Sequence, residues 1–208
     1  MNPSKKLDVR TLTQLAILVA IELVMKLIGL GSVPVGPLYM SFLTVPIAVG
    51  AIVLGPVASA VLGGVFGAVS FMDAVKGASI MTSSLLAVSP VHTFILCFGM
   101  RVLMGVCVGL VYGGMARIST KSVFNCFVTS LSAPLLNTLF FMGYIVLAFY
   151  QTDYVQSLVI AKGAGNPLMF VVLLVGVQGV VEAIVCSVTG TAVGSALLRV
   201  TGRMAATR

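Results

Sequence analysis

Residues 44–74, TVPIAVGAIVLGPVASAVLGGVFGAVSFMDA, contain a single charged side chain, Asp73. The stretch is interrupted once, by Gly55-Pro56, a pair that ends a helix and turns the chain. The sequence therefore predicts two apolar helices, over Thr44–Leu54 and Val57–Ala74, joined by a tight turn.

The rest of the chain has the same apolar character. Of its 208 residues, 59% are hydrophobic and 8% are charged, whereas a soluble domain carries about 25% charged residues. The apolar runs are too long for the alternating pattern of an outer-membrane β-barrel. At about 20 residues per crossing, the apolar content is enough for about six helical spans. We expect an all-α integral membrane protein, with residues 1–208 forming one domain.

Glycine, proline and polar clusters set the limits of the six expected spans. We predict them over Leu12–Leu30, Thr44–Leu54, Val57–Ala74, Thr93–Ala116, Val123–Tyr150 and Pro167–Leu198. The first is read as a retained helix, because no small-residue cleavage pattern follows the basic start. The connections after Leu30, over Lys76–His92 and after Tyr150 are expected to be long loops on one side.

Basic residues determine the expected orientation. The net charge is +7, and most of the basic side chains fall at the two termini and between the fourth and fifth spans. Cytoplasmic loops are enriched in Lys and Arg, so we place both termini in the cytoplasm and the long loops outside. The positive charge is thus explained by topology, and no nucleic-acid partner is expected.

Five spans each place one polar residue at the same distance from the cytoplasmic edge. Lys26, Asp73, Arg101, Asn137 and Glu182 each lie 16 or 17 residues from a cytoplasmic anchor. At 1.5 Å per residue this is about 24 to 26 Å, in the outer part of a core about 30 Å thick. Ionisable residues inside a membrane are functional candidates by default. We therefore expect a ligand cavity that opens to the outside, beneath the long loops.

The residue types suggest roles in such a cavity. The planar fork of Arg101 suits a carboxylate, and Asn137 and Gln178 can donate and accept hydrogen bonds. Glu182 lies one turn from Gln178 on the same helix face. Asp73 shares the polar layer, and Tyr39 and Ser84 are expected to close the cavity from above.

The same residues also have a structural explanation. Arg101 can pair with Glu182, and Lys26 can pair with Glu22 or Asp73, simply to make their burial tolerable. Tyr39 and Ser84 can equally be ordinary loop residues.

Other kinds of site find little support. The four cysteines lie singly in apolar stretches and His92 stands alone, so no metal site is expected. No nucleotide-binding or hydrolase motif occurs, so no cofactor is expected in this chain. An intramembrane enzyme using Asp73, Glu182 and Arg101 lacks an accompanying nucleophile. A stand-alone channel or secondary transporter is a further alternative, although no internal repeat is evident.

Small residues mark faces where helices can approach closely. Three groups of glycines are expected to pack inside the bundle: Gly63-Gly64 with Gly67, Gly109 with Gly113, and Gly190 with Gly194. Ala16 and Ala20 form an AxxxA pair on the first helix, for which packing inside the monomer is the simpler explanation.

Several segments together resemble a known family. They are SVPVG (32–36), VPIAVGAIVLGP (45–56), CFGMRVLMG (97–105), LNT (136–138) and EAIV (182–185). With six short helices and the AxxxA pair, they resemble the substrate-binding S component of energy-coupling factor (ECF) vitamin transporters. The pantothenate-specific branch is the most similar one, with riboflavin, pyridoxine-like and folate components as alternatives.

The resemblance implies a non-enzymatic subunit of the bacterial cytoplasmic membrane that captures a vitamin from outside. It implies docking through Ala16 and Ala20 onto a membrane-embedded coupling (T) subunit bound to two ATPases, which hydrolyse the ATP. It also implies that the whole S component topples to release its substrate. Arg101 and Asn137 suit the carboxylate, hydroxyls and amide of pantothenate.

Overall fold

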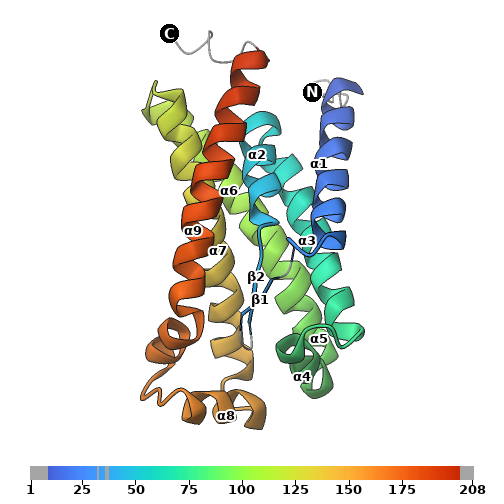
Figure 1. The fold of residues 1–208 in the computed structure, drawn as a ribbon, viewed down its shortest axis with the longest axis vertical. Helices are drawn as coiled ribbons and strands as arrows, with labels where there is room; N and C mark the ends of the chain where they lie inside the picture. Colours follow the sequence, from blue (N-terminus) through green and yellow to red (C-terminus); the bar gives the residue numbers. More distant parts are fainter. Residues whose placement is uncertain (1–8, 32, 36–37, 202–208) are drawn as a thin grey trace, which may run out of the picture.

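The computed structural model describes residues 9–31, 33–35 and 38–201, which are almost entirely helical (Figure 1). Four of the described helical runs are long and apolar enough to cross a membrane. They are α3 (Pro56–Val75), the continuous run of α5 (Pro90–Phe94), η1 (Ile95–Gly99) and α6 (Met100–Ile118), α7 (Ser122–Phe149) and α9 (Pro167–Val200). The shorter helices are α1 (Val9–Leu27), α2 (Thr44–Leu54), α4 (Ile80–Val88) and α8 (Asp153–Ala161). The all-α prediction is confirmed, and the count of six spans stays a prediction.

The turn between α2 and α3 forms where the sequence predicted it. Helix α2 has the predicted limits and is followed by Gly55 as its C-cap. Gly55 has φ +94°, a backbone conformation that glycine adopts at little cost and other residues rarely adopt. Pro56 occupies the first turn of α3, where its missing N–H breaks no hydrogen bond.

The predicted loops contain regular structure, and this corrects the prediction for residues 76–92. Helix α4 occupies most of that segment, and α5 begins at Pro90, where the Ser89 hydroxyl accepts a hydrogen bond from the backbone N–H of His92. The connection after Tyr150 contains α8, capped by the Thr152 side chain. The first long connection contains a hairpin of β1 (Val33–Val35) and β2 (Leu38–Met40), which are antiparallel. We call β1, β2, α4 and α8 together the cap.

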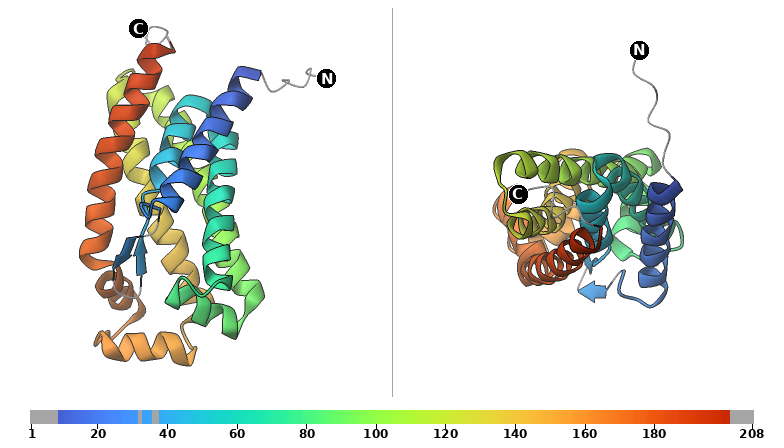
Figure 2. Two further views of the ribbon diagram at one scale, coloured as in Figure 1. Left: turned by 45° about the vertical axis from the view of Figure 1, so that its right-hand side comes forward. Right: turned by 90° about the horizontal axis from the view of Figure 1, so that it is seen from above.

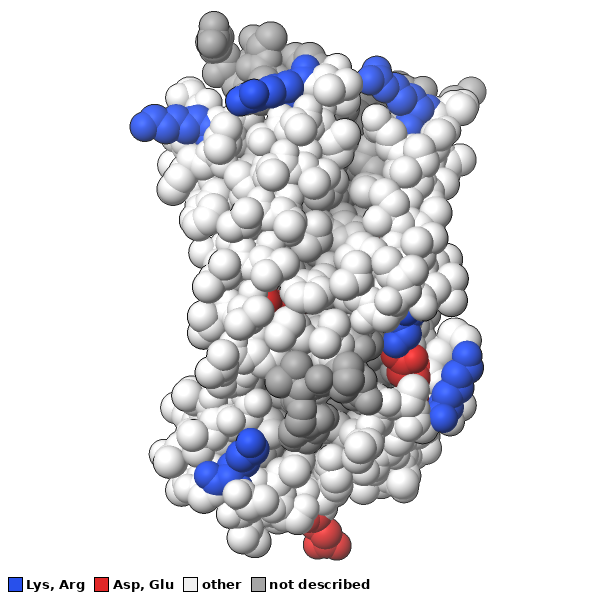
Figure 3. Space-filling view, viewed as in Figure 1, with Lys and Arg blue, Asp and Glu red and all other residues white. Residues whose placement is uncertain are grey.

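The two ends of the bundle differ in charge and in structure. Helix α1 begins and α9 ends at one end of the molecule, and α4 and α8 lie at the other (Figures 1 and 2). Lys and Arg side chains gather around the end that carries both termini (Figure 3). This arrangement agrees with the charge pattern from which the cytoplasmic position of the termini was predicted, and that position stays a prediction.

Close contact between α3 and α6 depends on three glycines. A Cβ on Gly63 would lie 2.3 Å from the backbone oxygen of Arg101, and one on Gly105 would lie 2.2 Å from that of Ser59. A Cβ on Gly109 would lie 2.3 Å from Cα of Pro56. Any side chain at these positions would separate the two helices, so the glycines permit the close spacing between α3 and α6, the helix that carries Arg101.

Two of the long helices depart from α geometry. The η1 segment, just before Arg101, is a π-helical turn, a feature often found at functional sites. In α9, Gly176 has φ 42° and ψ −134°, so the helix is broken there. The sequence predicted an uninterrupted sixth span and missed this break.

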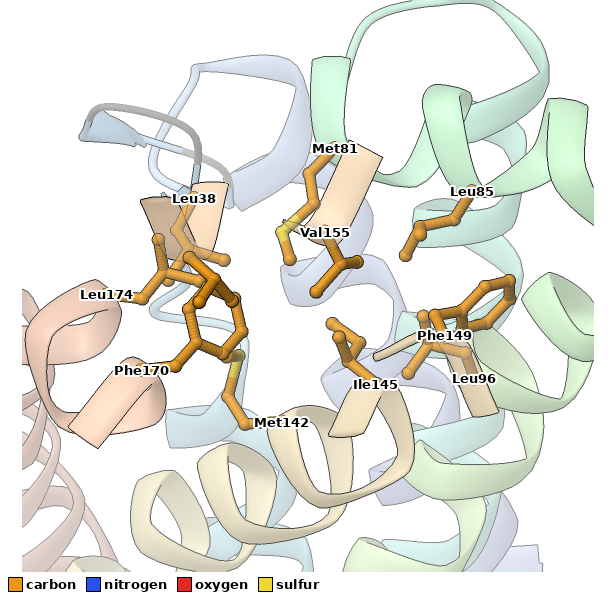
Figure 4. Close-up of a cluster of buried hydrophobic side chains, with 11 residues drawn as sticks. Leu38, Met81, Leu85, Leu96, Met142, Ile145, Phe149, Val155, Phe170 and Leu174 are labelled. Atoms are coloured by element: carbon orange, nitrogen blue, oxygen red, sulfur yellow. The ribbon is translucent and has the colours of Figure 1, made fainter. Parts of the chain in front are cut away.

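Apolar contacts hold the cap onto the bundle. Met81 and Leu85 from α4, Val155 from α8 and Leu38 from β2 contribute to one buried cluster. Figure 4 shows them facing side chains from η1, α7 and α9, including Leu96, Met142, Ile145, Phe149, Phe170 and Leu174. The cap is therefore part of the packed structure and closes this end of the bundle.

Candidate functional site

A cavity of about 80 Å³ lies where the cap meets α3, α6, α7 and α9. Its apolar lining includes Leu38, Phe66, Met81 and Phe141. Its polar lining comes from seven elements or connections and comprises Ser41, Ser70, Asp73, Ser79, Thr82, Arg101, Asn137, Thr138, Gln178 and Glu182. Polar groups from both ends of the sequence thus converge on one site.

Arg101 is held in place by contacts on three sides. Its guanidinium carbon lies 4.3 Å from the ring centre of Phe66 and 4.8 Å from that of Phe141. Its Nη1 donates a hydrogen bond to the backbone oxygen of Cys97 at 3.2 Å. The residue is only 8% exposed, and its Nε has no hydrogen-bond partner in the described structure. The rings orient the guanidinium and leave one of its donors unused beside the cavity.

Two acceptors beside the cavity are also unused. Oε1 of Gln178 and Oε1 of Glu182 are buried and have no hydrogen-bond partner in the described structure. The backbone N–H of Ser41 faces the Glu182 carboxylate. An unpaired buried polar group costs about 1 to 3 kcal/mol, so three such atoms around one cavity indicate a site built for a polar guest.

Arg101 and Glu182 do not pair with each other in the part of the chain that the structure describes. The salt bridge found there joins Lys26 Nζ to Asp73 Oδ2. The pairing predicted as a structural alternative is therefore wrong for Arg101 and Glu182 and confirmed for Lys26 and Asp73. Glu22, the other predicted partner of Lys26, is 1% exposed, and neither of its carboxylate oxygens has a hydrogen-bond partner in the described residues.

The structure places most, but not all, of the predicted ligand residues at the cavity. Arg101, Asn137, Gln178, Glu182 and Asp73 all line it. Their role in binding stays a prediction.

Ser84 does not line the cavity, because its hydroxyl is directed to the backbone oxygen of Ile80 on its own helix. Tyr39 pairs with Pro34 in the hairpin, and its side chain lies outside the described part of the structure.

Sequence reasoning missed the aromatic walls and several hydroxyls. Phe66 and Ser70 precede Asp73 by seven and three residues, and Phe141 follows Asn137 by four, so they share helix faces with the predicted residues. Extending each polar position by helical spacing would have found them. Thr82 was missed because residues 76–92 were treated as a loop, for which no helix face can be assigned.

Ala16 and Ala20 lie on the outer face of α1. Both are exposed, whereas Leu15 and Leu18 on the same helix pack against the core that includes α2. Packing of the AxxxA pair inside the monomer is therefore wrong. A face of small residues is left open on a helix at the edge of the bundle.

The site offers recognition chemistry. It combines one cation, two carboxylates, one of which has a free acceptor, two amide side chains and several hydroxyls, a set whose chemistry suits a compact polar molecule. Among the described residues, no group of three or more His, Cys, Asp or Glu side chains is placed to hold a metal ion.

Comparison with known families gives a match to most of the chain. The model of the family described as "ECF transporter, substrate-specific component" matches residues 10–193. The match includes α1 from its second residue onward and every residue that lines the cavity. A search of curated proteins gave no match to this chain.

Proposed function

This chain belongs to the substrate-specific components of ECF transporters, and we propose that its substrate is pantothenate, bound in the cavity around Arg101. Members of this family are multi-pass membrane proteins that bind a transported substrate for an ECF module, and they are not enzymes. What the match leaves open is the substrate, and the chemistry of the cavity is the basis for the choice.

The main support is the unpaired donor of Arg101. A buried donor without a hydrogen-bond partner is costly, and a carboxylate that accepts from a guanidinium removes that cost. Phe66 and Phe141 face the guanidinium and leave its edge for an anion. Pantothenate carries one carboxylate, and we assign that group to Arg101.

The remaining polar groups suit the rest of the molecule. The hydroxyls and amide N–H of pantothenate are donors, and Gln178 Oε1 and Glu182 Oε1 are unpaired acceptors. Asn137 offers both a donor and an acceptor for the amide carbonyl and a hydroxyl. Asp73 is neutralised by Lys26, so it adds little repulsion toward an anionic substrate.

Binding requires the cap to move. A cavity of about 80 Å³ is smaller than the roughly 300 to 1,000 Å³ of typical ligand pockets. The cap covers the cavity with Leu38 and Met81, which belong to its apolar cluster. We propose that the cap opens to admit the substrate from outside the cell and closes over it again.

Transport requires partners that hydrolyse ATP. We propose that the exposed Ala16 and Ala20 face docks onto the membrane-embedded coupling subunit, which two ATPase subunits drive. Small side chains allow two helix backbones to approach within a bilayer. Toppling of the whole subunit would then expose the cavity to the cytoplasm of the bacterial cell.

Replacing Arg101 tests the assignment of the carboxylate. The Arg101→Ala variant should bind pantothenate roughly 10- to 150-fold more weakly, since hydrogen bonds to charged groups contribute about 1.5 to 3 kcal/mol. It should bind pantothenol, the alcohol analogue, with an affinity close to that of the wild type. Titration calorimetry on detergent-purified protein measures both. An equal loss for acid and alcohol would show that Arg101 only supports the structure.

A further inference from the structure

A long apolar groove runs between α7 and α9. Its volume is about 1,260 Å³, and it extends from Phe127 to Leu147 along α7 and from Pro167 to Ser187 along α9. Twenty residues of helix correspond to about 30 Å, the thickness of the hydrocarbon core. Exposed side chains such as Leu139, Leu147 and Val177 line it. We call this feature the α7–α9 groove.

The groove and the polar cavity share a wall. Thr138 and Met142 from α7, and Val175 and Gly179 from α9, line both of them. Three side chains and one glycine therefore line both the polar cavity and the apolar α7–α9 groove.

At Gly179 the wall is filled by the Val175 side chain, because Val175 Cγ1 lies 2.4 Å from where a Cβ on Gly179 would be. Helix α9 leaves helical geometry at Gly176, one turn from Gly179. Both glycines line the groove, and a Cβ on Gly176 would meet no atom within 4 Å. The break in α9 thus lies beside the wall that the cavity and the groove share.

The two spaces are complementary in chemistry. The cavity is lined by Arg101, Gln178 and Glu182, each of which has a buried polar atom without a hydrogen-bond partner in the described structure, but the cavity is small. The groove is large and lined almost wholly by apolar side chains. We propose that the α7–α9 groove is a subsite for the apolar tail of an amphiphilic acid, whose carboxylate and amide lie in the cavity.

This inference rests on the proposed carboxylate site at Arg101 and extends its substrate class. It predicts that the subunit accepts acyl amides with tails longer than that of pantothenate. The competing occupant of the groove is the acyl chain of a membrane lipid, which would contact the apolar lining without using the cavity.

A homologous series tests the subsite. N-acetyl-, N-butanoyl-, N-hexanoyl- and N-octanoyl-β-alanine share a carboxylate and an amide and differ only in tail length. Binding is measured by titration calorimetry on the protein in nanodiscs of phosphatidylcholine and phosphatidylglycerol, with empty nanodiscs as the blank. A buried methylene contributes up to about 0.8 kcal/mol, so Kd should fall by up to about fourfold per added methylene.

Matched variants locate the tail. Gly143→Leu fills the groove on the cap side of the wall, where a Cβ meets no atom within 4 Å, and Ala183→Leu fills it on the other side. One of the two should abolish the dependence on chain length while N-acetyl-β-alanine binds within twofold of the wild type. Gly113→Leu on α6, which also meets open space and lies outside the groove, should leave the whole series unchanged.

The outcomes separate the subsite from the proposed function. Affinity that is independent of tail length in the wild type, or a length dependence that survives both variants, would overturn the subsite and leave the carboxylate site standing. A phospholipid that co-purifies with the wild type and is lost in the blocked variants, together with a flat series, would assign the groove to lipid. Absence of binding by the series and by pantothenate would overturn both proposals.

Discussion

Replacing Gly63 by alanine should disturb the site through the backbone of Arg101. The added Cβ would lie 2.3 Å from the Arg101 carbonyl oxygen and 3.0 Å from its carbon. An ordinary contact at this position is 3.4 Å or more, so α3 and α6 must separate by roughly 1 Å. Overpacking of this kind costs about 1 to 3 kcal/mol. For a chain of this size, that corresponds to a fall of roughly 2 to 12 °C in the apparent Tm.

The same displacement should weaken substrate binding. Phe66, on α3, contacts the Arg101 guanidinium, so separating α3 from α6 moves the guanidinium relative to its aromatic support. We expect pantothenate to bind the Gly63→Ala variant about tenfold more weakly, equivalent to about 1.4 kcal/mol.

The neighbouring glycine provides the control. A Cβ on Gly64 would lie 3.6 Å from Val102 Cγ2 and 3.7 Å from Phe98 Cζ, which are ordinary contacts. Gly64→Ala should therefore preserve the apparent Tm and the affinity, or raise the Tm slightly, because alanine is the better helix former. Thermal unfolding in detergent and titration calorimetry on both variants check this. Equal behaviour of the two variants would refute the argument that close α3–α6 contact positions Arg101.

Two further predictions concern α9 and α1. Gly176→Ala should lower the apparent Tm by an amount equivalent to about 1 to 3 kcal/mol, since φ 42° with ψ −134° is strained for any other residue. Gly143→Ala, in the neighbouring helix and equally open, should leave the Tm unchanged. An unchanged Tm for both variants would show that α9 is continuous in solution. Ala20→Trp should abolish pantothenate uptake by cells that express the complete transporter. Pantothenate binding to the isolated subunit should stay intact, because Ala20 is exposed. Loss of binding as well would show that this face is part of the monomer's own packing.

Helix limits were predictable where the chain carries strong local signals. Gly55-Pro56 defines the end of α2 and the start of α3 through backbone geometry alone, and the predicted Thr44–Leu54 helix was confirmed. Over residues 76–92, serines and threonines resembled a loop. Burial of Met81 and Leu85 against the bundle instead stabilises α4, and such tertiary packing leaves no strong mark in a nine-residue segment.

The candidate site was predictable in position but not in its detailed contacts. Counting residues from the cytoplasmic edge placed Arg101, Asn137 and Glu182 at one level, because rise per residue in a helix is fixed. The same counting gave no information on rotation about the helix axes. It therefore did not reveal that Arg101 would lie against Phe66 and Phe141 and would form no salt bridge with Glu182.

The central claim is that the cavity around Arg101 binds pantothenate, and one ligand screen tests it directly. The purified protein in detergent is titrated by calorimetry with pantothenate, riboflavin, pyridoxine, folate, thiamin and biotin. We expect saturable one-to-one binding of pantothenate alone. Tight binding of another vitamin, with no heat from pantothenate, would contradict it.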